Sequence, residues 1–160
     1  NAVTGGVKNH GGSTMIAALV ASGQLWFASV GDSRIYLLRG GSMIPLTRAH
    51  IYETDLYRKA AEYGTSFEAA ASDSQRSALT SYIGMGELEH VDCSQQPLTL
   101  VPGDWIALMT DGVFNELTSE EIARALSGNA PEAAERIEKM VLAKGDPHQD
   151  NFTAVLLRVF

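Results

Sequence analysis

Apolar and polar residues change their spacing along the chain, and the changes predict strands first and helices later. Four stretches rich in β-branched, aromatic and leucine residues are separated by turn sequences of hairpin length, which predicts an antiparallel meander. These stretches cover residues 14–21, 24–30, 34–39 and 43–46. Residues 51–63 then place apolar side chains at helical spacing, and the small, polar residues 64–78 predict a surface segment between core elements.

The last third of the chain returns to core-like patterns. Two apolar stretches predict strands, the next two segments carry helix-start signals, and the chain finishes on a strongly apolar strand. In order, these elements cover residues 88–93, 104–110, 117–126, about 131–143 and 151–160. Antiparallel strands with helices grouped between them indicate an α+β sandwich, and not a parallel, doubly wound sheet.

One short run carries the clearest signal of burial. Residues 105–109 read WIALM, and such an uninterrupted apolar run predicts a strand that is covered on both faces. Asp111 follows where this run stops. An unpaired carboxylate at that depth would be costly, so Asp111 is expected either in an exposed turn or beside a positive charge.

Three aspartates stand at predicted strand ends. Asp32 lies in the turn between two apolar strands, Asp111 follows another strand, and Asp150 precedes the last one. Because neighbouring strands of an antiparallel sheet begin and end side by side, these carboxylates are expected to converge on one edge and to bind Mg²⁺ or Mn²⁺. Each of them alone has another explanation, since Asp-Gly and Asp-Asn are common turn formers.

Composition narrows the class of protein. The 160 residues are 45% hydrophobic and 19% charged, which is typical of one globular domain. The formal net charge of −7 disfavours nucleic acid or an anionic membrane as the main partner. Cys93 is the single cysteine, which agrees with a reducing compartment, so we expect a cytoplasmic protein. The sequence shows neither a signal-peptide pattern nor an apolar run of the ~20 residues that span a bilayer.

Four motifs in a fixed order resemble a known family. They read GDSRIYLL at 31–38, LTRAH at 46–50, TDGVFNEL at 110–117 and DNFTAVLL at 150–157. From about Gly12 to Phe160 the chain resembles the metal-dependent protein phosphatases of the type 2C class. The resemblance implies a sandwich of two antiparallel sheets flanked by helices, and removal of phosphate from phosphoserine and phosphothreonine in proteins.

The resemblance also implies roles for the three aspartates. In that family, the residues that match Asp111 and Asp150 bind a pair of metal ions, Mn²⁺ or Mg²⁺. The residue that matches Asp32 joins Asp111 around a third, weaker site. No nucleophilic side chain is then required, which agrees with the absence of a Gly-x-Ser-x-Gly motif from the sequence.

Two features depart from the family pattern. The family's amino-terminal Asp-Gly-x-Gly-Gly-His motif and its Arg and Glu-Asp motif have no match here, so residues 1–160 are predicted to be the carboxy-terminal majority of one phosphatase domain. Its own missing amino-terminal segment is then a predicted partner, and residues 51–78 are predicted to be a flap-like insertion. Ala49 replaces an aspartate of the family, which predicts the loss of a helix cap.

The sequence leaves three functions open. The first is a genuine phosphatase, which the intact Asp32, Asp111 and Asp150 favour. The second is a catalytically inactive phosphatase-fold module that binds or regulates, and the third is an unrelated metal-dependent hydrolase. The four histidines are scattered and are predicted to be structural or exposed; they are His10, His50, His90 and His148.

Overall fold

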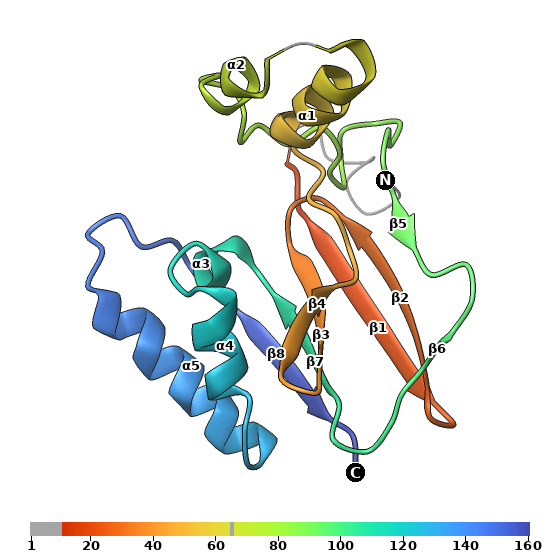
Figure 1. Cartoon of the computed structure of the whole chain (residues 1–160), viewed down its shortest axis with the longest axis vertical. Helices are drawn as coiled ribbons and strands as arrows, with labels where there is room; N and C mark the ends of the chain where they lie inside the picture. The colour runs from red at the N-terminus through yellow and green to blue at the C-terminus, as the bar shows by residue number, and fades with distance from the viewer. Residues whose placement is uncertain (1–10, 65) are drawn as a thin grey trace.

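Two antiparallel sheets form the centre of the molecule (Figure 1). The computed structural model describes residues 11–64 and 66–160. In the first sheet β2 pairs with β1, β5 and β6, and in the second sheet the order is β4-β3-β7-β8. The strands of the first sheet are β1 (Met15–Ala21), β2 (Gln24–Val30), β5 (Asp92–Cys93) and β6 (Leu98–Thr99). Those of the second are β3 (Arg34–Arg39), β4 (Ser42–Pro45), β7 (Trp105–Met109) and β8 (Ala154–Arg158).

The helices form two groups. One group packs on the second sheet and the other lies beyond the strand ends, at the top of Figure 1. The first group is α3 (Asp111–Phe114), α4 (Ser119–Ala125) and α5 (Ala130–Lys144), and the second is α1 (Tyr52–Tyr63) and α2 (Phe67–Ala71). The predicted α+β sandwich of two antiparallel sheets with flanking helices is therefore confirmed.

The central strands of the second sheet, β3 and β7, are buried on both faces, as the WIALM run predicts for β7. One face of β3 and β7 packs on the first sheet with Ile35, Leu37, Ile106 and Leu108. The opposite face meets the helices with Tyr36, Leu38, Trp105, Ala107 and Met109. Because side chains alternate between the faces of a strand, only a strand covered on both sides needs apolar residues at every position.

Local signals set the ends of two helices. Thr118 and Glu121 form a capping box, in which the Glu121 N–H donates to Thr118 Oγ1 at 3.2 Å and the Thr118 N–H donates to Glu121 Oε2 at 2.9 Å. Asn129 caps α5 by accepting the Glu132 N–H at 3.0 Å, and α5 ends at Gly145 with φ of 65°. Each contact satisfies a backbone group that a helix end leaves unpaired.

The sequence prediction is wrong for residues 88–93, of which only Asp92 and Cys93 are in a strand. The backbone of His90 is bonded instead to the buried Ser81 hydroxyl, which accepts its N–H at 3.2 Å and donates to its carbonyl at 2.7 Å. The Ser81 side chain therefore makes the backbone hydrogen bonds of His90 that a neighbouring strand would otherwise make. The short strand β6 was not predicted at all.

Residues 64–78 are more ordered than their composition predicts, because they contain the helix α2. The Ser66 hydroxyl accepts the Glu68 N–H at 3.1 Å and begins this helix. Both ends of the excursion are joined, since the Tyr52 N–H donates to the Ala78 carbonyl at 2.9 Å. Residues 51–78 thus leave the sandwich and return to it at one place.

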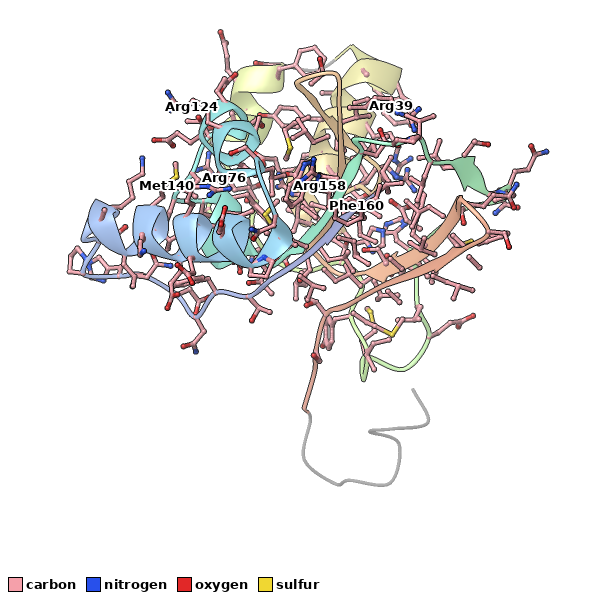
Figure 2. The ribbon with its side chains drawn as sticks, turned by 90° about the horizontal axis from the view of Figure 1, so that it is seen from below. Arg39, Arg76, Arg124, Met140, Arg158 and Phe160 are labelled. Carbon is pink, nitrogen blue, oxygen red and sulfur yellow. The ribbon has the colours of Figure 1, made fainter. Side chains whose placement is uncertain are left out.

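The last strand closes the second sheet and is shorter than the predicted 151–160. Arg158 lies with its guanidinium carbon 5.2 Å from the Phe160 ring centroid and 5.7 Å from that of Trp105 (Figure 2). Such a cation over aromatic rings shields part of the strand from water. In the described part of the chain, every helix is too short or too polar to cross a membrane.

Candidate functional site

Asp32 sits in a turn that admits little variation. The turn joins β2 to β3, and Gly31 has φ of 104°, in the left-handed region that favours glycine. A Cβ at Gly31 would lie 2.4 Å from Thr14 Cγ2. The Ser33 carbonyl accepts the Ser29 hydroxyl at 3.4 Å, and the Ser33 hydroxyl lies 2.9 Å from that of Thr14. The half-buried Asp32 is therefore carried by a turn that is held on both sides.

Asp111 does not end a strand, contrary to the sequence prediction. β7 stops at Met109, and Asp111 is the first residue of the one-turn helix α3. The Thr110 N–H donates to the Thr153 carbonyl at 3.1 Å, and the Thr153 N–H donates to Thr110 Oγ1 at 2.9 Å. These two bonds fix the chain that enters α3, so the Asp111 backbone is tied to the segment that leads into β8.

Gly112 brings the motif that contains Asp111 against the motif that contains Asp150. A Cβ at Gly112 would lie 2.6 Å from the Asn151 carbonyl oxygen, so only glycine fits. The Gln149 side-chain amide donates to the Gly112 carbonyl at 3.1 Å and to the Asp150 carbonyl at 2.8 Å. The two short motifs are therefore in direct contact, although 37 residues separate Gly112 from Gln149.

Strand register places the three aspartates at the same end of the second sheet. Arg34 pairs with Met109, and Met109 pairs with Ala154. Continued two residues past the strand ends, the β3–β7 register sets Asp32 opposite Asp111. Asp150 precedes β8 at that same end, so the shared edge that the sequence predicts is confirmed.

At this edge the charge of Asp111 acts on Asp32. Burial raises the pKa of Asp32, and the negative charge of Asp111 raises it further. The backbone N–H groups of Asp32 and Ser33 and the charge of Arg34 oppose this rise. Among the described residues, no lysine, arginine or histidine forms an ion pair with any of the three aspartates.

The predicted convergence of three carboxylates is not what the structure shows. Asp150 is exposed, and its Oδ1 accepts the Asn151 N–H at 2.7 Å. Within residues 11–64 and 66–160, no three His, Cys, Asp or Glu side chains are grouped so that they could hold a metal ion. A common edge of the sheet therefore does not by itself bring the three carboxylates together.

The pair formed by Asp32 and Asp111 nevertheless fits a hard cation. Two carboxylates without a positive partner raise the energy of their own ionised state, and a divalent cation would relieve it. The pair alone offers fewer oxygens than the six to eight ligands that such ions take, so other oxygen ligands must complete the shell. The metal-binding roles of Asp32, Asp111 and Asp150 remain predictions.

Sequence reasoning assigned no role to Arg34, which lies two residues after Asp32. Its guanidinium carbon is 4.0 Å from the Phe114 ring centroid, and its Nη1 donates to the Tyr36 hydroxyl at 3.3 Å. Arg34 also lines a groove of about 480 Å³ that reaches α1, where Glu53 and Thr54 contribute to the wall. Its place in the GDSR motif was the available signal.

The histidines agree in part with their predicted role. His50 is buried and hydrogen-bonded, and His148 is exposed. His90 is half-buried, and His10 lies outside the described residues. The N-cap residue of α1 is Ile51, which makes no side-chain cap hydrogen bond, and the effect of Ala49 on a helix cap stays a prediction.

Comparisons with known proteins point to one family. The family model described as protein phosphatase 2C matches residues 4–55. A 2C-type protein from Streptococcus pyogenes is 31% identical over 150 residues, which are 94% of this chain and 58% of that protein. The serine/threonine protein phosphatase PstP of Mycobacterium tuberculosis is 31% identical over 149 residues, which are 92% of this chain and 27% of PstP.

A solved structure agrees with the sequence relatives. PppA of Pseudomonas aeruginosa superposes with a TM-score of 0.76 at 27% identity, over 93% of this chain and 58% of PppA. The chain therefore spans little more than half the length of two of these relatives and about a quarter of PstP. The four motifs, the sheet order and these likenesses agree, and all of them point to the protein phosphatase 2C family.

Proposed function

We propose that the protein containing this chain hydrolyses phosphoserine and phosphothreonine in proteins with the help of divalent metal ions. The observation that carries the proposal is the β3–β7 register, which when continued sets Asp32 opposite Asp111 at a strand end where, among the described residues, neither carboxylate forms an ion pair. The relative PstP is named as a serine/threonine protein phosphatase, and the relative PhpP is named as a protein phosphatase. The likeness of this chain to these phosphatases supports the same reaction here.

The residues of this chain would hold the metal and orient the substrate. Asp111 and Asp150 would provide carboxylate ligands to two ions, and Asp32 would share Asp111 with a third, weaker ion. Mn²⁺ or Mg²⁺ would supply Lewis acidity toward the phosphoryl oxygens and lower the pKa of water. A structural relative, the catalytic domain of PstP, is described in complex with 2 manganese ions, which supports manganese as the first metal to test.

The proposal is tested with Asp111→Asn and Asp150→Asn in the full-length protein. Each change removes one negative charge and keeps the shape of the side chain. We expect both variants to lose at least ~10²-fold in turnover of an aryl phosphate at limiting Mn²⁺, because several kcal/mol of charge stabilisation depends on the metal.

Asp146→Asn is the matched control. Asp146 is an exposed aspartate in the same loop, and its Oδ1 accepts the His148 N–H at 2.8 Å. This variant should retain wild-type turnover and wild-type metal requirement. Undiminished turnover of Asp111→Asn or Asp150→Asn at limiting metal would refute the assignment.

One observation favours the second candidate function, an inactive module that binds or regulates. The described residues do not form a three-ligand metal site. Calorimetry with Mn²⁺ and an assay on phosphopeptides distinguish the two functions. Metal binding with hydrolysis supports the enzyme, whereas partner binding without hydrolysis at saturating Mn²⁺ supports the module.

We further propose that residues 51–78 form a flap that recognises the phosphoprotein. The groove that Arg34 lines continues to α1, so a substrate held near Asp32 would lie against this segment. Loops held on a rigid scaffold are frequent sites of specificity. The hydrogen bond between Tyr52 and Ala78 lets the outer part change without moving the ends.

Replacing residues 64–75 by a short Gly/Ser linker tests this role of the flap. We expect the rate on a phosphoprotein to fall about tenfold and the rate on a small aryl phosphate to change less than about twofold, since only the protein substrate reaches the outer flap. Equal losses on both substrates would argue against recognition by the flap.

A further inference from the structure

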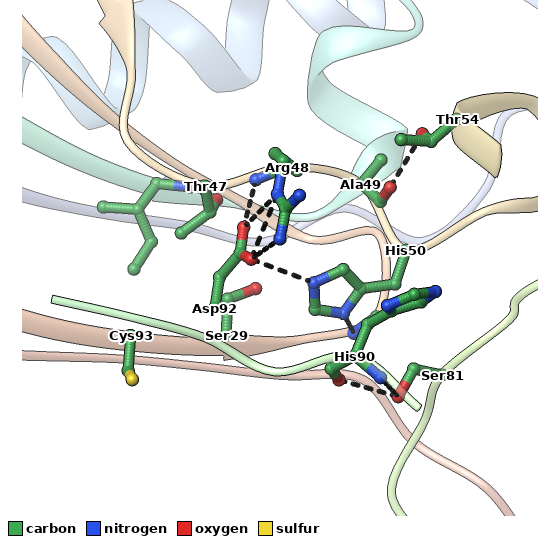
Figure 3. Close-up of polar contacts among 12 residues, drawn as sticks. Ser29, Thr47, Arg48, Ala49, His50, Thr54, Ser81, His90, Asp92 and Cys93 are labelled. Carbon is green, nitrogen blue, oxygen red and sulfur yellow. Dashed lines mark hydrogen bonds and ion pairs between the residues drawn. The ribbon is translucent and has the colours of Figure 1, made fainter. Parts of the chain in front are cut away.

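His50, which lies beside Asp92 and His90 in Figure 3, is hydrogen-bonded twice to Gly31, the residue that precedes Asp32. The His50 N–H donates to the Gly31 carbonyl at 3.0 Å, and the Gly31 N–H donates to His50 Nδ1 at 3.1 Å. The His50 side chain is only 3% exposed. The two bonds close a ring between residues that are 19 positions apart, and they use both polar backbone groups of Gly31.

The direction of these bonds fixes the proton on the imidazole. Because the Gly31 N–H donates to Nδ1, Nδ1 carries no proton, and the neutral ring holds its proton on Nε2. Nε2 faces Asp92 Oδ1 at 3.5 Å. A second proton would set an Nδ1–H group against the Gly31 N–H, so protonation and the Gly31 bond exclude each other.

The surroundings keep His50 neutral. Burial lowers its pKa, and so do the charges of His90 and Arg48, whereas the negative charge of the nearby Asp92 raises it. The rings of His50 and His90 have their centroids 5.7 Å apart. Burial is the largest of these effects, so the pKa of His50 lies below its usual value of 6.5.

Asp92 anchors the far side of the imidazole. It accepts the Arg48 backbone N–H at 2.7 Å and Arg48 Nη2 at 2.7 Å, and it pairs with Ser29 across the first sheet. Ser29 is also the residue whose hydroxyl donates to the Ser33 carbonyl. The imidazole therefore lies between β5 and the turn, and both are fixed to β2.

We propose that His50 is a positioning residue for Asp32, because it sets the orientation of the Gly31 peptide and thereby holds the Asp32 carboxylate beside Asp111. The turn has little freedom to compensate, since Gly31 is packed on Thr14. The use of this position for metal binding rests on the proposed function. The inference that His50 sets the orientation of the Gly31 peptide does not rest on the proposed function.

Two substitutions separate the two sides of the imidazole. In His50→Asn the amide oxygen can take the place of Nδ1 and accept the Gly31 N–H, but the contact with Asp92 is lost. In His50→Gln the amide nitrogen can take the place of Nε2 and donate to Asp92, but the acceptor for Gly31 is lost. Both variants are neutral and polar, so each serves as the control of the other.

The readouts are taken on the full-length protein, first without metal. We expect His50→Asn to keep the hydrogen-exchange protection of the Gly31 amide and the NMR shift of the Asp32 carboxyl carbon. We expect His50→Gln to lose at least ~tenfold in Gly31 protection and to shift the Asp32 signal. The Mn²⁺ concentration for half-saturation should rise about tenfold in His50→Gln only, as expected when a group that orients a metal ligand is lost.

Three results would overturn the inference. One is equal loss of Gly31 protection in both variants, and another is loss in His50→Asn alone, which would assign the role to the Asp92 contact. If neither variant folds, the wild-type protein is titrated instead. The third contrary result is then a Gly31 amide chemical shift that does not follow protonation of the His50 ring. An inactive wild-type protein with the expected Gly31 result would refute the proposed function alone.

Discussion

The two ends of the paired strands β3 and β7 differ in the charges that the strand register sets opposite each other. Where β7 begins, Arg39 lies opposite Asp104, and where β7 has ended, Asp32 lies opposite Asp111. Asp104 is 1% exposed and accepts Arg39 Nε at 2.9 Å, Arg39 Nη2 at 2.6 Å and the Val101 N–H at 2.8 Å. At the other end the charge of Asp111 acts on Asp32, and in the described part of the chain neither aspartate has such a partner.

The pKa directions express this difference. Arg39 lowers the pKa of Asp104 through a hydrogen bond that outweighs the effect of burial. Burial and the charge of Asp111 raise the pKa of Asp32. The charge of Asp104 at the first end is satisfied by Arg39, whereas the second end, where we propose that a metal ion binds, has two carboxylates of like charge.

The largest expected effect breaks the satisfied end. Asp104→Asn removes the charge that Arg39 pairs with at a fully buried position, so we expect the free energy of unfolding to fall by about 2–4 kcal/mol. Arg39→Met should also lower the free energy of unfolding, by less than Asp104→Asn, because it leaves the buried Asp104 carboxylate unpaired. Urea unfolding followed by circular dichroism measures both. Stability equal to that of the wild type would show that the pair contributes nothing to folding.

The unsatisfied end should respond in the opposite way. Asp32→Asn keeps the acceptor for the backbone N–H groups and removes the repulsion from Asp111, so the free energy of unfolding without metal should be unchanged or slightly higher. The metal concentration needed for half-maximal activity should rise about tenfold, since a charged ligand is lost. A variant that is unfolded by circular dichroism would favour a purely turn-forming role for Asp32.

The sequence predicts elements better than it predicts partners. The WIALM run and the strand-end aspartates are local patterns. The structure confirms that the run is buried and that the aspartates lie at a common edge of the sheet. The partner of Asp104 is 65 residues away, and no spacing rule points to Arg39. The ring of His50 with Gly31 also depends on a tertiary approach that has no sequence period.

Short elements also escaped prediction for a physical reason. The strand β6 has two residues and α3 has four, so neither shows the repeated spacing on which pattern analysis depends. Asp111 consequently looked like the end of a strand, although Thr110 already turns the chain into α3. Strand order alone could not show whether Asp150 joins Asp32 and Asp111 in one group of carboxylates, and the structure contains no such group among the described residues.

The smallest expected effect is a difference in titration between the two ends. In metal-free protein, carboxyl-carbon NMR should find that Asp32 titrates above its usual pKa of 3.8 and Asp104 below it. Asp111→Asn should lower the pKa of Asp32, because it removes the second largest cause of the rise, and Asp146→Asn should not. An unchanged Asp32 midpoint in Asp111→Asn would show that the two carboxylates do not interact.

The same titration fixes the sign of each contribution to stability. The folded pKa of Asp104 is lower than the unfolded one, so its stabilisation is present above the unfolded value of about 3.8 and is lost as the pH falls through the folded pKa. The folded pKa of Asp32 is higher than the unfolded one, so the folded state binds the proton first and Asp32 becomes less destabilising as the pH falls through that pKa. Relative to wild type, Asp104→Asn should therefore have its largest stability deficit at neutral pH, and that deficit should shrink below pH ~4. A deficit that stays constant down to pH ~2 would show that the charge of Asp104 is not what Arg39 stabilises.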